Sequence, residues 1–86
     1  GPRRTMEDQI LKIEDIYVPM KRRQTLDPVA VEAIAESMLE VGQRQPIQVR
    51  QDGERLVLVE GLQRLEACKS LGEDTIVGLL VRSRRR

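Results

Sequence analysis

The chain of 86 residues contains no histidine, no tryptophan and no phenylalanine, and it has one cysteine and one tyrosine. A single cysteine forms no internal disulfide, and without histidine there is no Cys/His zinc site and no Ser-His or Cys-His catalytic pair. No apolar run approaches the roughly 20 residues of a membrane-spanning helix, and no signal peptide is visible. The default expectation is a cytoplasmic protein without a membrane anchor.

The scarcity of aromatic rings means that the core must be aliphatic. Apolar residues make up 40% of the chain, which is adequate for one small globular domain. Aliphatic side chains supply smaller contact areas than rings, so we expect modest stability or self-association, for example as a homodimer. The net charge is +1, but basic residues cluster at Arg3-Arg4, Lys21 to Arg23 and Arg82 to Arg86. Such clusters could contact DNA phosphates without reading the sequence, although charge runs at loops and ends are more often solvated.

The ends of the chain are treated separately from the domain. Gly1-Pro2 resembles a protease-tag scar and Met6 a native start, so residues 1–5 are expected to be tag or disordered. Residues 6–82 form one domain, and residues 83–86 are a basic tail.

The first third of the chain predicts a strand, a loop and a helix. Ile10, Leu11 and Ile13 suit a strand, followed by a turn or short helix around Glu14-Asp15, whereas residues 21–25 are polar without a period and predict a loop. Asp27-Pro28 is a strong helix start, and Gly42 is suited to end that helix. The helix has an apolar stripe (Val31, Ile34, Ala35, Met38, Leu39) and an outer acidic row (Glu32, Glu36, Glu40), which is a solvated face or a contact for a basic partner.

The second half predicts a hairpin, a helix and a strand. Residues 45–50 and 56–60 are the two arms around an Asp52-Gly53 turn, residues 62–71 follow as a helix, and residues 75–81 are the last strand. Cys68 lies near the apolar stripe of that helix and is expected to pack as a small apolar residue. The fold class is α+β, with two main helices packed on a small mixed β-sheet.

The stretch from Leu56 to Cys68 passes from a strand through Gly61 into a helix. Such a turn aims free backbone N–H groups and the positive end of the helix dipole at one point, which favours an anion such as phosphate. Arg64 lies in the first turn and could add a positive charge. The alternative is a plain connection, because strand–Gly–helix turns are common.

Several segments, in order, resemble the ParB/sulfiredoxin superfamily over residues 9–82. They are Ile13-Glu14-Asp15-Ile16 with Pro19, Leu26-Asp27-Pro28 through Gly42, Gln45-Pro46-Ile47 with Val49-Arg50, the "GxxR…A" motif within residues 59–67, and Leu71-Gly72 to Ile76. The resemblance implies the family fold and a nucleotide site, for CTP or ATP, at the Gly61 turn. It carries over Gly61 as the close-approach glycine, Arg64 as the phosphate arginine, Arg22 and Arg23 in a loop over the triphosphate, and Gln45 near the nucleotide. Leu62 and Gln63 occupy the turn, and Ser37 is retained from the sulfiredoxin helix.

The turn departs from both branches of the family. Sulfiredoxins have Gly-Cys-His-Arg, whereas here the positions read Gly61-Leu62-Gln63-Arg64, so cysteine sulfinic reductase activity is not expected. ParB has Gly-Glu-Arg-Arg, so Leu62 and Gln63 replace one metal contact and one phosphate contact. Partition proteins also carry a helix-turn-helix domain and a dimerisation tail after this fold, so the chain is either an excised domain or a small stand-alone member.

Three functions follow from these observations. The first is a bacterial nucleotide-binding ParB-like module, regulatory or associated with DNA and plasmid partition, with a nucleoside triphosphate, non-specific DNA or a protein as partner. The second is a nucleotide-dependent enzyme (a nuclease, NTP hydrolase or small-molecule kinase) that uses Glu60 as base or through Mg²⁺. The alternative for Glu60 is an exposed strand-end acid or a charge partner of the helix N-terminus. The third is an interaction fold whose site has decayed, as Leu62 and Gln63 suggest.

Overall fold

The computed structural model describes residues 8–43 and 45–81. The elements, in order, are β1 (Asp8–Lys12), a 3₁₀ turn (Ile13–Asp15), β2 (Ile16–Tyr17), α1 (Met20–Arg23), α2 (Pro28–Val41), β3 (Ile47–Asp52), β4 (Arg55–Glu60), α3 (Leu62–Ser70) and β5 (Thr75–Leu80). The predicted α+β class is confirmed. The proposed tag (1–5) and basic tail (83–86) lie outside the described residues.

The five strands form one mixed sheet in the order β1-β5-β3-β4-β2. The β1–β5 and β3–β4 pairs are antiparallel, whereas β3–β5 and β2–β4 are parallel. The parallel β3–β5 pair requires a crossover connection, which here consists of β4 followed by α3. The predicted hairpin is confirmed, because Asp52 pairs with Arg55 and Gly53 has a positive φ of 65°.

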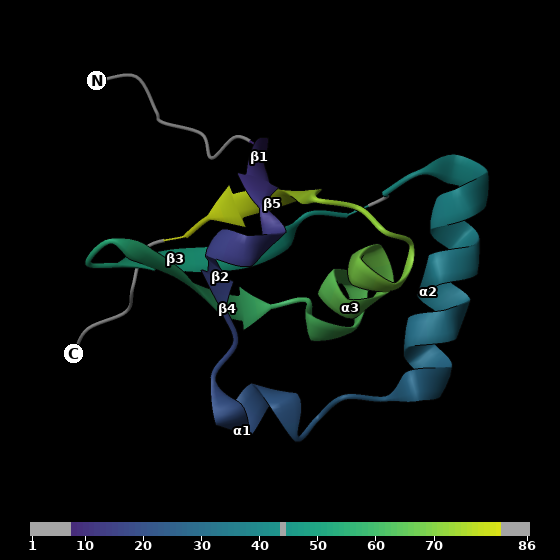
Figure 1. The fold of residues 1–86 in the computed structure, drawn as a ribbon, viewed down its shortest axis with the longest axis horizontal. Helices are drawn as coiled ribbons and strands as arrows, with labels where there is room; N and C mark the ends of the chain where they lie inside the picture. Colours follow the sequence, from purple (N-terminus) through teal and green to yellow (C-terminus); the bar gives the residue numbers. More distant parts are fainter. Residues whose placement is uncertain (1–7, 44, 82–86) are drawn as a thin grey trace.

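The helices lie in two layers beside the sheet. In Figure 1, α3 lies between the sheet and α2, and α2 packs mainly against α3. The core between the sheet and α3 is aliphatic, as predicted, and comprises Ile13, Val18, Ile47, Val49, Leu58, Leu62, Leu65, Cys68 and Ile76. This arrangement fixes the start of α3 against the middle of the sheet.

Helix α2 begins and ends where the sequence predicts. The Asp27 side chain accepts a hydrogen bond from the Val29 N–H at 3.1 Å, and Gly42 closes the helix with φ of 79°. The predicted apolar stripe is only partly covered, because no residue of α2 is buried and Leu39 is 73% exposed. The reason is the outer position of α2, which rests on one helix instead of on the sheet. The acidic row Glu32, Glu36 and Glu40 is exposed, as expected of a solvated face.

The N-terminal third differs from prediction at Ile13, at residues 20–23 and at β2, a two-residue strand that the sequence did not predict. Ile13 does not belong to the first strand: it begins the 3₁₀ turn, its N–H donates to the Asp74 carbonyl at 2.9 Å, and its side chain is buried. The loop predicted over residues 21–25 was wrong in its first half, because α1 forms there. The N–H groups of Arg22 and Arg23 donate to the Pro19 carbonyl, so the preceding proline starts a single helical turn that a polar sequence does not reveal.

A bulge ends β4. Gln48 pairs with Glu60 and Val49 with Leu58, so Val59 is an extra residue between the two pairs. Bulges bend a strand and re-aim the residues that follow, often beside functional sites. Here the bend directly precedes Gly61 and the start of α3.

Candidate phosphate-binding site

The turn at Gly61 requires glycine for structural reasons. Its φ of 108° lies in the left-handed region, which side chains rarely adopt. A Cβ at this position would lie 2.7 Å from Cγ2 of Ile47 in β3. The backbone therefore packs directly onto Ile47 in β3. The close approach of Gly61 to a nucleotide, which the family resemblance implies, stays a prediction.

The first turn of α3 leaves its N–H groups free of side-chain caps. The Gly61 carbonyl accepts the first helical bond, from Leu65, at 2.9 Å. No side chain caps this end and no acidic residue lies in its first turn, in contrast to α2, which Asp27 caps. The start of α3 thus presents N–H donors and a positive dipole end, which together attract an anion.

A pocket of about 340 Å³ opens at this turn, and we call it the phosphate pocket. It brings together six of the eight predicted nucleotide-binding residues, together with the proposed catalytic Glu60. The six are Arg22, Gln45, Gly61, Leu62, Gln63 and Arg64. Segments far apart in the sequence, from the end of α1 to the start of α3, therefore meet at the turn.

Arg64 is half-buried and lines the phosphate pocket. Its Nε atom is buried and has no hydrogen-bond partner within residues 8–43 and 45–81. Arg64 also lines a neighbouring hollow of about 150 Å³ together with Ser37, which does not reach the phosphate pocket. A guanidinium with an unsatisfied buried N–H is a donor that an anionic ligand could satisfy.

The side chains of Gln63 and Leu62 make contacts within the protein: Gln63 makes hydrogen bonds to the backbone, and Leu62 packs in the core. The Gln63 amide group donates to the Thr25 carbonyl at 2.8 Å and accepts from the Asp27 N–H at 2.9 Å. Leu62 is only 6% exposed and belongs to the core cluster. Leu62 can therefore offer a ligand chiefly its backbone N–H, while Gln63 ties the loop after α1 to the start of α3.

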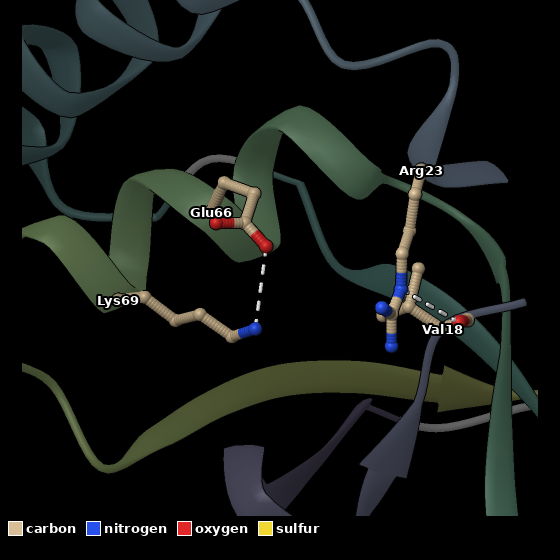
Figure 2. A network of polar contacts seen from close by, with 4 residues as sticks. All are labelled: Val18, Arg23, Glu66 and Lys69. Atoms are coloured by element: carbon tan, nitrogen blue, oxygen red, sulfur yellow. Dashed lines mark hydrogen bonds and ion pairs between the residues drawn. The ribbon is translucent and has the colours of Figure 1, made fainter. Parts of the chain in front are cut away.

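Arg23 points to a different part of the molecule. Its Nε donates to the Val18 carbonyl at 3.2 Å, and it does not line the phosphate pocket. Figure 2 shows this guanidinium beside Val18, across from the ion pair of Glu66 and Lys69 on α3. Of the two predicted arginines of the 21–25 segment, the structure brings only Arg22 to the pocket.

Cys68 packs as a small apolar residue, as predicted, and is 2% exposed. Burial raises the pKa of its thiol above the ordinary value, and the negative charge of Glu73 raises it further, whereas the positive charge of Arg64 lowers it. A thiol with a raised pKa is mostly protonated at neutral pH and is a poor nucleophile.

Four pocket residues were not predicted from the sequence: the polar Gln48 and Thr25, and the apolar Ile34 and Pro46. The alternation of buried Ile47 and Val49 around half-buried Gln48 is the signal that could have placed Gln48 on the outer face. Thr25 carries no local signal, since it is located only by its contact with Gln63, 38 positions away.

Within the described ranges, no group of three or more cysteine or acidic side chains could hold a metal ion, and no helix is long and apolar enough to cross a membrane.

The family model for the ParB N-terminal domain matches residues 3–85. The chain belongs to this family. A curated relative, the probable chromosome-partitioning protein ParB of Campylobacter jejuni, is 34% identical over 62 residues, which cover 72% of this chain and 22% of the relative. The chain thus spans about a fifth of the length of that ParB protein.

Solved structures share the fold of this ParB N-terminal domain. Sulfiredoxin from Arabidopsis thaliana has a TM-score of 0.81 at 26% identity, covering 90% of this chain and 86% of its own. A C-terminally truncated ParB from Caulobacter crescentus, complexed with CTP-gamma-S, has a TM-score of 0.72 at 24% identity, and the match covers 93% of this chain and 46% of that ParB chain. A free serine kinase mutant in complex with AMP has a TM-score of 0.77 at 18% identity, and the match covers 93% of this chain and 33% of the kinase chain. The last two likenesses show the fold alone.

Proposed function

We propose that this ParB N-terminal domain binds a nucleoside triphosphate, CTP or ATP, with its phosphates at the start of α3. The observation that carries the proposal is Arg64, whose buried Nε lacks a partner within the described residues and which lines the same pocket as the uncapped first turn. The ParB structure with CTP-gamma-S, which shares the fold, supports a nucleotide as the ligand.

The charges of the pocket suit a phosphate chain. Arg22 and Arg64 provide two guanidinium groups, and the helix N-terminus adds a partial positive charge. Among the described residues, Glu60 is the one carboxylate on the lining, at the end of β4. A Mg²⁺ ion would therefore be held largely by the phosphates themselves, with at most Glu60 from the protein, as is common for Mg²⁺ bound with nucleotides.

The remaining lining can position the nucleoside. Gln45, Gln48 and Thr25 place amide and hydroxyl groups on the pocket, and these can donate to and accept from a sugar or base. No aromatic ring lines the phosphate pocket, so base stacking contributes nothing there. The choice between CTP and ATP then depends on hydrogen bonding at the base edge.

Amide NMR titration with CTP, ATP and GTP, each with and without Mg²⁺, tests this proposal. We expect saturable shifts at residues 60–64 for at least one nucleotide, with a millimolar or tighter dissociation constant. Arg64→Gln should weaken binding about tenfold or more, because a charge-assisted hydrogen bond contributes roughly 1.5–3 kcal/mol. Arg55→Gln is the matched control, because Arg55 lies in β4 but does not line the phosphate pocket. Absence of shifts at the turn for all three nucleotides would refute the proposal.

An enzymatic role is the second candidate, favoured by the position of Glu60 on the phosphate pocket. A carboxylate beside bound phosphates can activate a water or a hydroxyl group, or help to hold Mg²⁺. Phosphate release from the nucleotide that binds should then be lost in Glu60→Gln while binding is kept. Binding without turnover in either protein would leave the module as a binder.

The association with DNA, a partner protein or a second copy is also a proposal, because the chain spans only 22% of the ParB relative. Arg22, Arg23 and the basic residues at the ends could contact phosphates non-specifically. Affinity for mixed-sequence duplex DNA should then fall steeply as salt is raised. A bacterial cytoplasmic setting with a partition or regulatory role is consistent with the family and remains a prediction, as does the third possibility, an interaction fold with a decayed site.

A further inference from the structure

A second hollow of about 400 Å³ lies between β2, α1 and α3, and we call it the α1–α3 pocket. Val18, Arg23, Leu26, Leu62, Glu66 and Lys69 are among its lining residues. Of the described residues, Leu62 alone lines both this pocket and the phosphate pocket, and Leu62 is buried. A ligand in the α1–α3 pocket would therefore contact a different set of side chains from a nucleotide.

Arg23 is held in this pocket by the backbone. Its Nε donates to the Val18 carbonyl at 3.2 Å in a partly buried bond, which Figure 2 shows as a dashed line. A guanidinium has five N–H donors in a planar fork, so this single bond leaves the N–H groups of the two terminal nitrogens available for a carboxylate or phosphate. Within residues 8–43 and 45–81, no carboxylate lies within ion-pair distance of Arg23.

The other charges of the pocket compensate each other. Lys69 and Glu66 lie on the facing side, on α3, and form an ion pair at 3.2 Å, as Figure 2 shows. Since that pair is close to neutral, the uncompensated charge among the described lining residues is that of Arg23. The ring of Tyr17, which also lines the pocket, is covered by the Arg55 guanidinium at 4.2 Å, and this adds positive charge nearby.

Apolar residues also line the pocket. Val18 and Leu62 are buried, whereas Leu26 is 44% exposed. An exposed leucine beside a pre-positioned guanidinium suits a ligand that combines an anionic head with an apolar body. We propose that the α1–α3 pocket binds a small organic anion of this class, with its carboxylate or phosphate monoester on Arg23 and its apolar body on Leu26.

A ligand series that changes only the head group tests this inference. Hexanoate and hexyl phosphate should shift the amides of Val18, Leu26, Glu66 and Lys69 and saturate on the order of 1–10 mM, as fragments do. Hexan-1-ol and hexylammonium share the body but not the negative charge, and we expect them to bind at least about tenfold more weakly. Comparison of hexanoate with hexyl phosphate then shows which anionic head Arg23 prefers.

Two variants distinguish the effect of the Arg23 guanidinium on binding from the effect of another positive charge on the same helix. Arg23→Gln should weaken hexanoate about tenfold, whereas Lys21→Gln, on the same short helix but on neither pocket, should leave it unchanged. Leu26→Glu places a negative charge beside the negatively charged ligand and should abolish binding. This variant tests the pocket independently, in case Arg23→Gln perturbs the fold.

Three outcomes overturn the inference. They are equal binding of hexan-1-ol and hexanoate, unchanged affinity in Arg23→Gln, and anion-induced shifts confined to residues 60–64. The last result would assign these anions to the phosphate pocket, so this test stands or falls independently of nucleotide binding.

Discussion

The side chain of Gln63 fastens the start of α3 to the turn at Thr25: its Nε2 donates to the Thr25 carbonyl at 2.8 Å. Its Oε1 accepts from the Asp27 N–H at 2.9 Å, and Thr25 Oγ1 in turn donates to the Arg22 carbonyl at 2.7 Å. Gln63 thus holds the turn that carries Arg22 to the phosphate pocket. The resemblance to ParB implies an arginine at this position, and the two hydrogen bonds give Gln63 a structural role beside the phosphate pocket.

Gln63→Ala should loosen this turn without unfolding the domain. Both hydrogen bonds are exposed, so we expect a loss of about 0.5 kcal/mol for each in the free energy of unfolding. The Asp27 amide should exchange faster with solvent, even without nucleotide, and nucleotide affinity should fall several-fold because Arg22 is no longer positioned.

Gln51→Ala is the matched control for Gln63→Ala. Its side-chain amide donates to the Gly53 carbonyl at 3.0 Å in the hairpin, away from the phosphate pocket. It should leave both Asp27 exchange and nucleotide affinity unchanged. Unaltered Asp27 exchange in Gln63→Ala would contradict the positioning role, whatever the nucleotide affinity.

Gly61→Ala should destabilise the domain more than Gly42→Ala. Both glycines have positive φ, so both substitutions cost about 1 kcal/mol or more in backbone strain. Only at Gly61 does the new Cβ meet Ile47, at 2.7 Å, whereas nothing lies within 4 Å at Gly42. We expect an additional 1–3 kcal/mol, approximately, from overpacking, measured by urea unfolding. If both variants lose the same free energy of unfolding, β3 shifts to accommodate the added methyl group and the overpacking argument is wrong.

Asp27→Ala should shorten or fray the first turn of α2. Its side chain accepts from the Val29 N–H at 3.1 Å, and loss of such a cap costs about 0.5–2 kcal/mol. The bond from the Asp27 backbone N–H to Gln63 is retained in this variant, so nucleotide binding should change little. Asp27→Asn should restore most of the stability, because asparagine caps helices well; the same loss in both variants would exclude the cap as the cause.

Local signals in the sequence predict most of this fold, and contacts between distant residues account for the rest. The Asp27-Pro28 start and the Asp52-Gly53 turn are specified by neighbouring residues, and both appear as expected. Helix α1 and the two-residue β2 are too short to show a period, and the exposure of Leu39 depends on α2 lying outside α3. The motif at Gly61 indicated the pocket, but the separation of Arg22 from Arg23 follows from the turn of α1, which the sequence did not reveal.

The raised pKa of the Cys68 thiol predicts that the protein loses stability at alkaline pH. Its pKa is raised in the folded protein, so as pH rises above about 8.5 the unfolded chain releases the thiol proton while the folded chain keeps it. The unfolded state then binds fewer protons, and the free energy of unfolding falls with pH until the folded thiol also ionises. Cys68→Ala removes this contribution: it should be less stable at pH 7, because it leaves a cavity, but should lose less stability between about pH 8 and 10. Urea unfolding of both proteins across that range is the measurement, and parallel pH profiles would show that burial of Cys68 does not perturb its ionisation.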